Sequence, residues 1–152
     1  MGVAADAETS ACAGVPEPRL LSRAQLEQEG QALGRELPPG AVVFLEGELG
    51  AGKTTLARAI ARGLGVTEPV SSPTYALVHH HETPDGPVYH LDCYRLRSPD
   101  DAADLDWATL ESARALLLEW PERAGAWAPR PTHRIRLARV PGQEALRSWE
   151  AT

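Results

Sequence analysis

The sequence predicts an α/β fold with three layers (α/β/α), in which helices cover both faces of a mixed sheet made of a parallel core plus an antiparallel hairpin. Three observations support this prediction. An apolar, β-branched run at residues 41–46 leads through a glycine-rich loop into helix formers, which is typical of a buried parallel strand and the helix after it. Residues 115–119 form a second apolar run. Residues 75–82 and 88–91 are strand-like segments separated by a Pro-Asp-Gly turn, which indicates a hairpin.

The elements before the glycine-rich loop are a tail and a helix. Residues 1–19 are rich in Ala and Pro and lack the basic and apolar parts of a signal peptide, so we expect a disordered tail. Residues 22–37 carry leucines near helical spacing, and Ser22 with Gln25 fits a capping box. This segment is therefore expected to be an amphipathic helix, and the dipeptide Pro38-Pro39 ends it.

The elements after the loop begin with a helix that continues to the next glycines. Ser98 and Pro99 suit the cap and the first position of a short acidic helix. Residues 133–140 alternate apolar and basic side chains, which predicts a last strand. We therefore divide the chain into a disordered tail at 1–19, one domain at 20–140 and a C-terminal tail at 141–152.

The composition excludes several classes of protein. The chain has 152 residues and a formal net charge of −6, whereas proteins that bind nucleic acid alone usually carry a basic patch. We expect no contact with DNA, and contact with RNA only through protein partners. The sequence has no window of about 18 apolar residues, so no membrane span is expected. Cys12 and Cys93 lack a CxxC or metal-ligand spacing, which favours free thiols, a reducing compartment and a cytoplasmic location.

Residues 47–54 read GELGAGKT, a full GxxxxGK(S/T) motif between a predicted strand and a predicted helix. Glycines suit such a loop because the backbone must approach a phosphate closely and turn its N–H groups inward. The dipole of the following helix adds to the attraction for an anion. The motif predicts a P-loop NTPase-like fold and makes 20–140 a P-loop ATPase domain. The expected nucleotide-binding residues of the loop are Glu48, Leu49, Gly50, Ala51, Gly52, Lys53, Thr54 and Thr55.

Lys53 and the lack of asparagine narrow the expected ligand. Lys53 is the single lysine among 15 basic residues, and its compact ammonium suits the space between β- and γ-phosphates. Thr54 provides a hydroxyl for Mg²⁺. The chain contains no asparagine, so the Asn-Lys-x-Asp element that reads guanine cannot be formed. We therefore expect ATP and Mg²⁺ as the cofactors.

Two acidic residues at the ends of predicted strands are candidates for a second magnesium anchor. Glu119 ends ALLLE and Asp92 ends VYHLD; a solvated strand end is the alternative for each. Thr74, in the segment SSPT, either approaches the γ-phosphate or the metal, or belongs to a simple turn. The histidines at 79–81 favour a solvated hairpin edge over a metal site. Trp120 is expected either over the nucleotide pocket or on a partner surface.

Four blocks in this order, GELGAGKTT, SSPTYALV, YHLDCYRL and LLLEWPER, resemble the bacterial tRNA threonylcarbamoyladenosine biosynthesis ATPase family (TsaE, also called YjeE). The resemblance covers about residues 20–140. It implies a small P-loop ATPase that works with two partner proteins in making N6-threonylcarbamoyladenosine (t6A) at position 37 of ANN-decoding tRNAs. In that family the ATPase docks on the complex that transfers the threonylcarbamoyl group, and hydrolysis is thought to reset the complex between turnovers.

By position, the resemblance also implies roles for individual residues. Lys53 and Thr54 would hold phosphate and Mg²⁺, and Glu119 would be a metal ligand. Asp92 would position or activate the attacking water, and Thr74 would belong to a switch-like segment. Asp92, Lys53 and Thr74 are thus the expected catalytic residues.

Other positions are less specific. Trp120 and Glu122 of the EWPER block are expected beside the nucleotide. Gly30 departs from the family, which commonly has Thr there, so no adenine contact is assigned. An Arg finger, where one acts, comes from Arg95 or from a partner. Two other functions stay open: a small-molecule kinase, and an ATP-gated assembly module with negligible catalysis.

Overall fold

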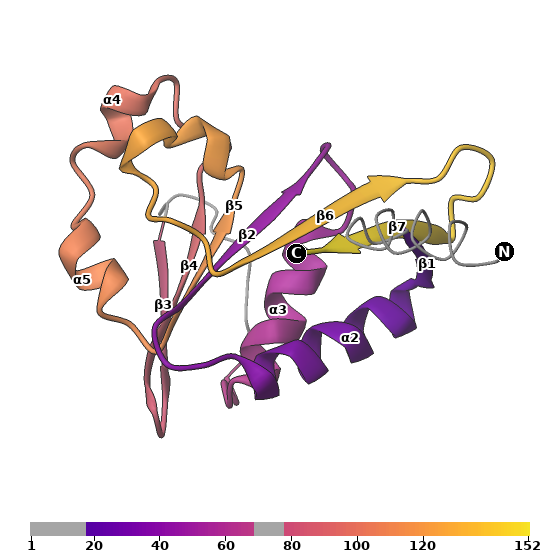
Figure 1. Ribbon diagram of the computed structural model, residues 1–152, viewed down its shortest axis with the longest axis horizontal. Helices are drawn as coiled ribbons and strands as arrows, with labels where there is room; N and C mark the ends of the chain where they lie inside the picture. The colour runs from indigo at the N-terminus through magenta and orange to yellow at the C-terminus, as the bar shows by residue number, and fades with distance from the viewer. Residues whose placement is uncertain (1–17, 69–77) are drawn as a thin grey trace, which may run out of the picture.

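The computed structural model describes residues 18–68 and 78–152. The strands in these residues are β1 (Arg19–Ser22), β2 (Ala41–Gly47), β3 (Val78–Thr83), β4 (Gly86–Asp92), β5 (Ala115–Glu119), β6 (His133–Arg139) and β7 (Leu146–Ala151). They form one sheet in the order β1-β7-β6-β2-β5-β4-β3 (Figure 1). The strands β6, β2, β5 and β4 are parallel, and antiparallel pairs flank them at both edges.

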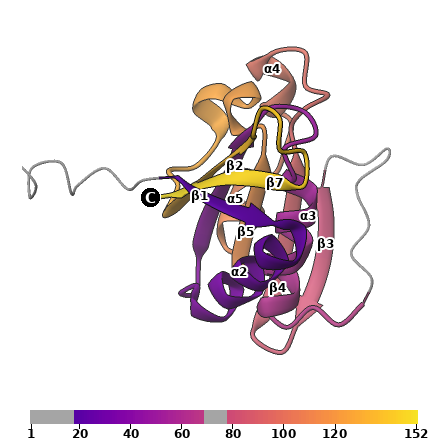
Figure 2. The same ribbon diagram turned by 90° about the vertical axis from the view of Figure 1, so that its right-hand side faces the viewer.

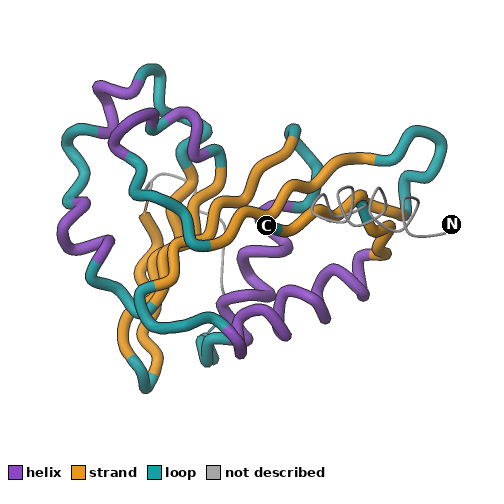
Figure 3. Tube along the Cα trace, in the orientation of Figure 1, coloured by secondary structure: helices purple, strands orange, loops and turns teal. Residues whose placement is uncertain are grey.

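Helices cover both faces of this sheet. They are α2 (Arg23–Glu36), α3 (Lys53–Gly63), α4 (Pro99–Ala102) and α5 (Trp107–Glu111), with the 3-10 turns η1 (Pro121–Arg123) and η2 (Gly125–Trp127). The two long helices pack on one face and the short helices on the other, as Figure 3 shows, and each side has its own buried apolar cluster. The predicted three-layer α/β/α fold with a mixed sheet is confirmed. Among the described residues, no helix has the length and apolar character needed to cross a membrane.

The predicted capping box at the start of α2 is present. The Ser22 hydroxyl accepts a hydrogen bond from the Gln25 backbone N–H at 3.2 Å, and the Gln25 side chain accepts one from the Ser22 N–H at 2.8 Å. These bonds satisfy two N–H groups that a helix start would otherwise leave unpaired. The helix ends at Glu36, before Pro38-Pro39.

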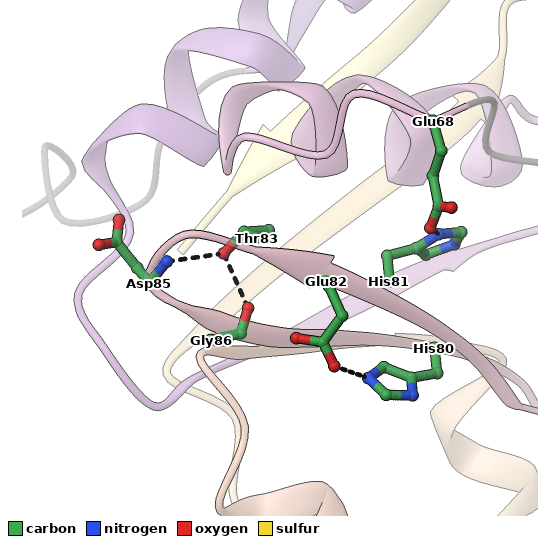
Figure 4. Close-up of polar contacts among 7 residues, drawn as sticks. All are labelled: Glu68, His80, His81, Glu82, Thr83, Asp85 and Gly86. Carbon is green, nitrogen blue, oxygen red and sulfur yellow. Dashed lines mark hydrogen bonds and ion pairs between the residues drawn. The ribbon is translucent and has the colours of Figure 1, made fainter.

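The predicted β3–β4 hairpin is also present, and its turn is held by one side chain. The Thr83 hydroxyl donates to the Gly86 carbonyl oxygen at 2.7 Å and accepts from the Asp85 backbone N–H at 3.2 Å, as Figure 4 shows. In the described residues β3 runs from Val78 to Thr83, and positions 75–77 of the predicted strand lie outside the described part of the chain.

The two outermost elements at the other edge of the sheet were not predicted. The segment 141–152, expected to be a C-terminal tail, contains β7, which pairs with β6 on one side and β1 on the other. Figure 2 shows β1 and β7 running side by side. Arg19, placed in the expected N-terminal tail, opens β1, while residues 1–17 lie outside the described residues. Both strands are defined by pairing between distant segments, which a local pattern does not reveal.

Glycines let α2 lie directly against α3. A Cβ atom at Gly30 would stand 2.6 Å from the Ala59 Cβ, and one at Gly34 would meet the Ile60 carbonyl oxygen. Gly63 on α3 faces the Gln31 backbone in the same way. Gly30, noted above as a departure from the related family, is therefore a contact point between the two helices in this chain. The close contact holds α3, which begins with Lys53, at a set position on the sheet.

Replacing Trp149 by Ala tests whether the C-terminal strand is part of the fold. Trp149 is 6% exposed in the core cluster, so we expect a loss of about 3–5 kcal/mol in the free energy of unfolding, measured by urea denaturation. Trp127→Ala is the matched control, because this side chain is 47% exposed and its removal should cost about 1 kcal/mol or less. Equal losses for the two variants would show that β7 contributes no more than a surface element.

Replacing Gly34 by Ala tests the helix contact. Alanine is favoured over glycine in a helix by about 1 kcal/mol, but here its methyl group meets the α3 backbone. We expect a net loss of about 1–3 kcal/mol in thermal or urea unfolding. Arg35→Ala, at the exposed neighbouring position, should leave stability within about 0.5 kcal/mol. A more stable Gly34→Ala protein would contradict the contact.

Candidate functional site

The glycine-rich loop connects β2 to α3 at the carboxyl ends of the parallel strands. Gly50 and Gly52 have φ of +79° and +105°, which favours glycine over other residues. Gly52 is the N-cap of α3, so no cap side chain covers the first N–H groups of that helix. Those N–H groups and the helix dipole together form a place that favours an anion.

Lys53 starts α3 and lies inside the loop. Its side chain is 4% exposed, and its ammonium donates to the carbonyl oxygens of Gly47 and Glu48, each at 2.7 Å. Burial lowers the pKa of Lys53, and the nearby charge of Glu119 opposes this shift more than that of Glu122 does. The ammonium also lies 4.3 Å from the centroid of the Trp120 ring, a cation–π contact. The loop therefore contains one buried cation surrounded by carbonyl and carboxylate oxygens.

Glu119 joins the loop helix to the centre of the sheet. The Thr54 hydroxyl donates to Glu119 Oε1 at 2.8 Å and lies 3.1 Å from Oε2. On the other side, His90 Nε2 lies 2.6 Å from Glu119 Oε2. Glu119 is 2% exposed, so these hydrogen bonds replace those that water would make with the carboxylate.

Asp92 lies beside Glu119, at the end of the neighbouring strand. The two residues are register partners in the parallel β4–β5 pair. Asp92 Oδ1 accepts a hydrogen bond from the Tyr94 backbone N–H at 3.0 Å. Burial raises the pKa of Asp92, the Tyr94 hydrogen bond lowers it, and the charge of Glu119 adds a further rise. The carboxylate is thus a stronger base than an ordinary aspartate.

These side chains open onto one cavity of about 470 Å³. Its lining contains nine of the expected site residues: Leu49, Gly50, Gly52, Lys53, Thr54, Thr55, Asp92, Glu119 and Trp120. Six further lining residues were missed in the sequence: Arg23, Leu26, Tyr94, Glu144, Ala145 and Arg147. The last three lie in the segment expected to be a tail. Glu144 and Ala145 precede β7 and Arg147 lies in it, and no local pattern in the sequence indicated them. Arg23 and Arg147 add two cationic groups to the lining of the cavity.

Three expected site residues have side chains that do not line this cavity, and a fourth lies outside the described part of the chain. Ala51 is fully buried and Glu48 accepts from the Arg139 N–H at 3.1 Å, so neither side chain lines the cavity. Glu122 lines two neighbouring hollows with Glu46 and not this one, although its charge acts on Lys53. Thr74 lies outside the described residues.

Trp120 has an unusual backbone conformation. Its φ of +55° is the one left-handed value among the non-glycine residues that the structure describes. The ring is held by Tyr94, with centroids 5.1 Å apart, and by the Arg123 guanidinium, 5.5 Å from its centroid. Strained conformations of this kind concentrate at functional sites because the surroundings must hold them in place. Here the strain places the indole beside Lys53.

The histidine run and the cysteine do not form a second site. His80 is exposed and paired with Glu82 at 2.6 Å, whereas His81 is buried and paired with Glu68 at 2.8 Å (Figure 4). The solvated-edge prediction thus holds for His80 and is wrong for His81. No cluster of three metal-ligand side chains occurs at residues 18–68 and 78–152. Burial raises the pKa of the Cys93 thiol to about 12, so this free cysteine stays protonated and unreactive.

A glycine-rich loop between a buried parallel strand and a helix, with a buried lysine and an acidic strand end beside it, defines a P-loop NTPase-like α/β protein. The crystal structure of Bacillus subtilis YdiB has the same fold, with a TM-score of 0.67 and 22% identity over 90% of this chain and 88% of that one. The sequence model of the family "Threonylcarbamoyl adenosine biosynthesis protein TsaE" matches residues 20–147. The chain belongs to the TsaE family.

Individual relatives agree with this assignment. The tRNA threonylcarbamoyladenosine biosynthesis protein TsaE of Nostoc sp. is 38% identical over 128 residues, which cover 81% of this chain and 76% of the relative. The protein of the same name from Streptomyces coelicolor is 38% identical over 123 residues, covering 79% and 83%.

Replacing Asp92 by Asn tests the electrostatic cost of the site. Because burial raises the pKa of Asp92, the folded state binds its proton more tightly than the unfolded state, and stability falls as the pH rises through that raised pKa. In Mg²⁺-free buffer at pH 8 the neutral amide should raise Tm by about 2–4 °C, the shift that roughly 1 kcal/mol gives in a domain of this size. The gain should shrink as the pH falls towards 4, because Asp92 itself takes up a proton more readily than an ordinary aspartate.

Asp106→Asn is the control for this experiment. Hydrogen bonds from Thr109 lower the pKa of Asp106, so its substitution should bring no gain in Tm at pH 8. A lower Tm for the Asp92→Asn protein, or a gain in Tm that is equal at both pH values, would contradict the claim that the buried charge of Asp92 destabilises the fold.

Proposed function

We propose that this protein binds and hydrolyses ATP with Mg²⁺ at the 470 Å³ cavity, in support of a partner complex that makes t6A at position 37 of ANN-decoding tRNAs. Membership of the TsaE family and the names of its relatives support the pathway. The observation that carries the ATPase is the convergence of Lys53, Thr54, Asp92 and Glu119, from three elements, on one cavity.

The phosphates would bind at the glycine-rich loop. The N–H groups at the start of α3 and the Lys53 ammonium provide positive charge at one point, which is what a polyphosphate requires. The apolar side chain of Leu26 and the guanidinium groups of Arg23 and Arg147 line the remaining wall, where the rest of the nucleotide would lie.

The residues beside the loop fit a magnesium ion. Mg²⁺ prefers oxygen ligands and is usually held by one or two carboxylates together with substrate phosphates. The Thr54 hydroxyl oxygen and Glu119 Oε1 lie 2.8 Å apart, and these two oxygen atoms would serve as ligands of the ion. When bound, the ion would neutralise charge on the β- and γ-phosphates.

Asp92 would act on the attacking water. In hydrolysis, the water oxygen bonds to the γ-phosphorus, the bond to the β–γ bridging oxygen breaks, and ADP and phosphate leave. Asp92 lines the cavity beside Glu119, its register partner on the neighbouring strand, and its raised pKa makes it better able to orient the water and accept its proton.

The surroundings of the cavity favour an ATPase that depends on partners. Leu49 and Tyr94 are 63% and 39% exposed at the cavity lining, so a docked protein could cover them. The short helices α4 and α5 are anchored in the core by Ala102 and Leu110, which argues against the mobile lid of a small-molecule kinase. We propose that the protein works in the cytoplasm and docks on the two proteins of the threonylcarbamoyl-transfer complex. It would contact tRNA only through these partners, and it would not bind DNA.

Lys53→Met should strongly weaken ATP binding. The substitution keeps the length of the side chain but removes the charge, so we expect the Kd for Mg·ATP in isothermal titration calorimetry to rise by about 100-fold or more. Arg62→Ala removes a cation at the exposed far end of the same helix and should leave the Kd unchanged. An equal rise in Kd for the two variants would indicate that the net charge of the protein governs binding, and not a phosphate site at Lys53.

Asp92→Asn should separate binding from catalysis. The amide cannot accept the proton of water, so hydrolysis should fall by about 10²–10⁴-fold while Mg·ATP binding is kept. Undiminished repeated tRNA modification by this variant, reconstituted with the partner proteins, would instead favour an ATP-gated assembly module. The pathway is tested separately by nucleotide-dependent co-purification with the two expected partners from the same organism. Lack of association with and without ATP would refute the pathway and leave the nucleotide site standing.

A further inference from the structure

His90 is a buried histidine that the proposed chemistry does not use directly. It lies on β4, two residues before Asp92, and is 1% exposed. Its Nε2 atom lies 2.6 Å from Glu119 Oε2, and its Nδ1 atom has no hydrogen-bond partner among the residues that the structure describes. Its ring meets the His79 ring edge to face, with centroids 6.5 Å apart.

An imidazole in this position is costly for stability alone. Burying a polar ring with one unpaired nitrogen costs free energy, whereas an aliphatic side chain would fill the same space without that cost. The compensating contact of His90 is its hydrogen bond to Glu119. The role of His90 is therefore to be sought in what that bond does to the carboxylate.

The contact with His90 constrains the carboxylate. Glu119 Oε2 lies 2.6 Å from His90 Nε2, and an ionised carboxylate only accepts hydrogen bonds, so Nε2 is the donor in this contact. Such a bond holds the carboxylate in one rotation about its axis.

We propose that His90 is a positioning residue for the magnesium site: by holding Glu119 Oε2 it turns Oε1 towards Thr54, and the Mg²⁺-dependent part of nucleotide affinity depends on this bond. The distances agree with separate roles for the two carboxylate oxygens, since the Thr54 hydroxyl lies closer to Oε1, at 2.8 Å, than to Oε2, at 3.1 Å. The inference rests on the proposed function, because it assigns His90 to the metal site of that function. Hydrogen bonds to metal-binding carboxylates typically contribute about 10- to 100-fold to metal affinity.

Two amide variants test the bond. Gln places an N–H donor near the position of the histidine Nε2, whereas Asn places it near Nδ1, away from Glu119. The measured quantity is the ratio of the Kd for ATP in EDTA to the Kd in Mg²⁺. We expect His90→Gln to keep most of the wild-type ratio and His90→Asn to lower it by about 10- to 100-fold, with the Kd in EDTA unchanged. His80→Asn, on the solvent side of the same hairpin, is the control and should keep the full ratio.

A double-mutant cycle with Glu119→Gln separates positioning from a general packing effect. If His90 acts through Glu119, His90→Asn should lower the ratio no further once Glu119 is replaced. Wild-type ratios in both amide variants, or additive losses in the cycle, would overturn the inference. A wild-type protein whose ATP affinity does not depend on Mg²⁺ would instead refute the proposed metal site itself, and the inference with it.

The donor atom of this bond can be read in the intact protein. Long-range ¹H–¹⁵N spectra of the wild-type chain with Mg²⁺ and ADP should show a proton on His90 Nε2. An Nδ1–H tautomer would overturn the inference, because Nε2 could then not donate to Glu119.

Discussion

The carboxylate of Glu119 holds the site together, because it hydrogen-bonds side chains from two other elements. Thr54 stands 65 residues away at the start of α3, and His90 stands 29 residues away on β4. A buried carboxylate is costly unless it is paired with donors, so Glu119 can end β5 inside the protein only where both partners are in place. This requirement sets the position of α3, and with it the glycine-rich loop, relative to the central strands. The parallel register then brings Asp92 beside Glu119.

The packing of the long helices supports the same arrangement from the opposite side. Gly30 and Gly34 let α2 press on α3, so that α3 is held between the sheet and a second helix. The price of this geometry is a concentration of buried charge, in which burial lowers the pKa of Lys53 and raises that of Asp92. A site of this kind is stabilised by a ligand that brings negative phosphates to the lysine and a cation to the carboxylates, which is the ligand proposed for it.

Local sequence patterns predicted the elements that have local causes. The capping box of α2, the strand–loop–helix unit around Lys53 and the strand end at Glu119 follow from nearest-neighbour chemistry, and the structure confirms each. The strands β1 and β7 depend on pairing between opposite ends of the chain, so their short patterns had no signal. For the same reason Arg147 was missed at the cavity, and His90 was passed over because its partner lies on another strand. Thr74 and the expected metal, nucleotide and partner roles stay predictions.

A crystal structure with Mg²⁺ and a non-hydrolysable ATP analogue is the most direct test of the proposed site. We expect phosphates against the N–H groups at the start of α3 and Mg²⁺ beside the Thr54 hydroxyl and the Glu119 carboxylate. We also expect His90 Nε2 to lie within hydrogen-bond distance of Glu119, as it does in the present structure. A nucleotide bound in another hollow, or a metal ion that neither Thr54 nor Glu119 approaches, would contradict the proposed site.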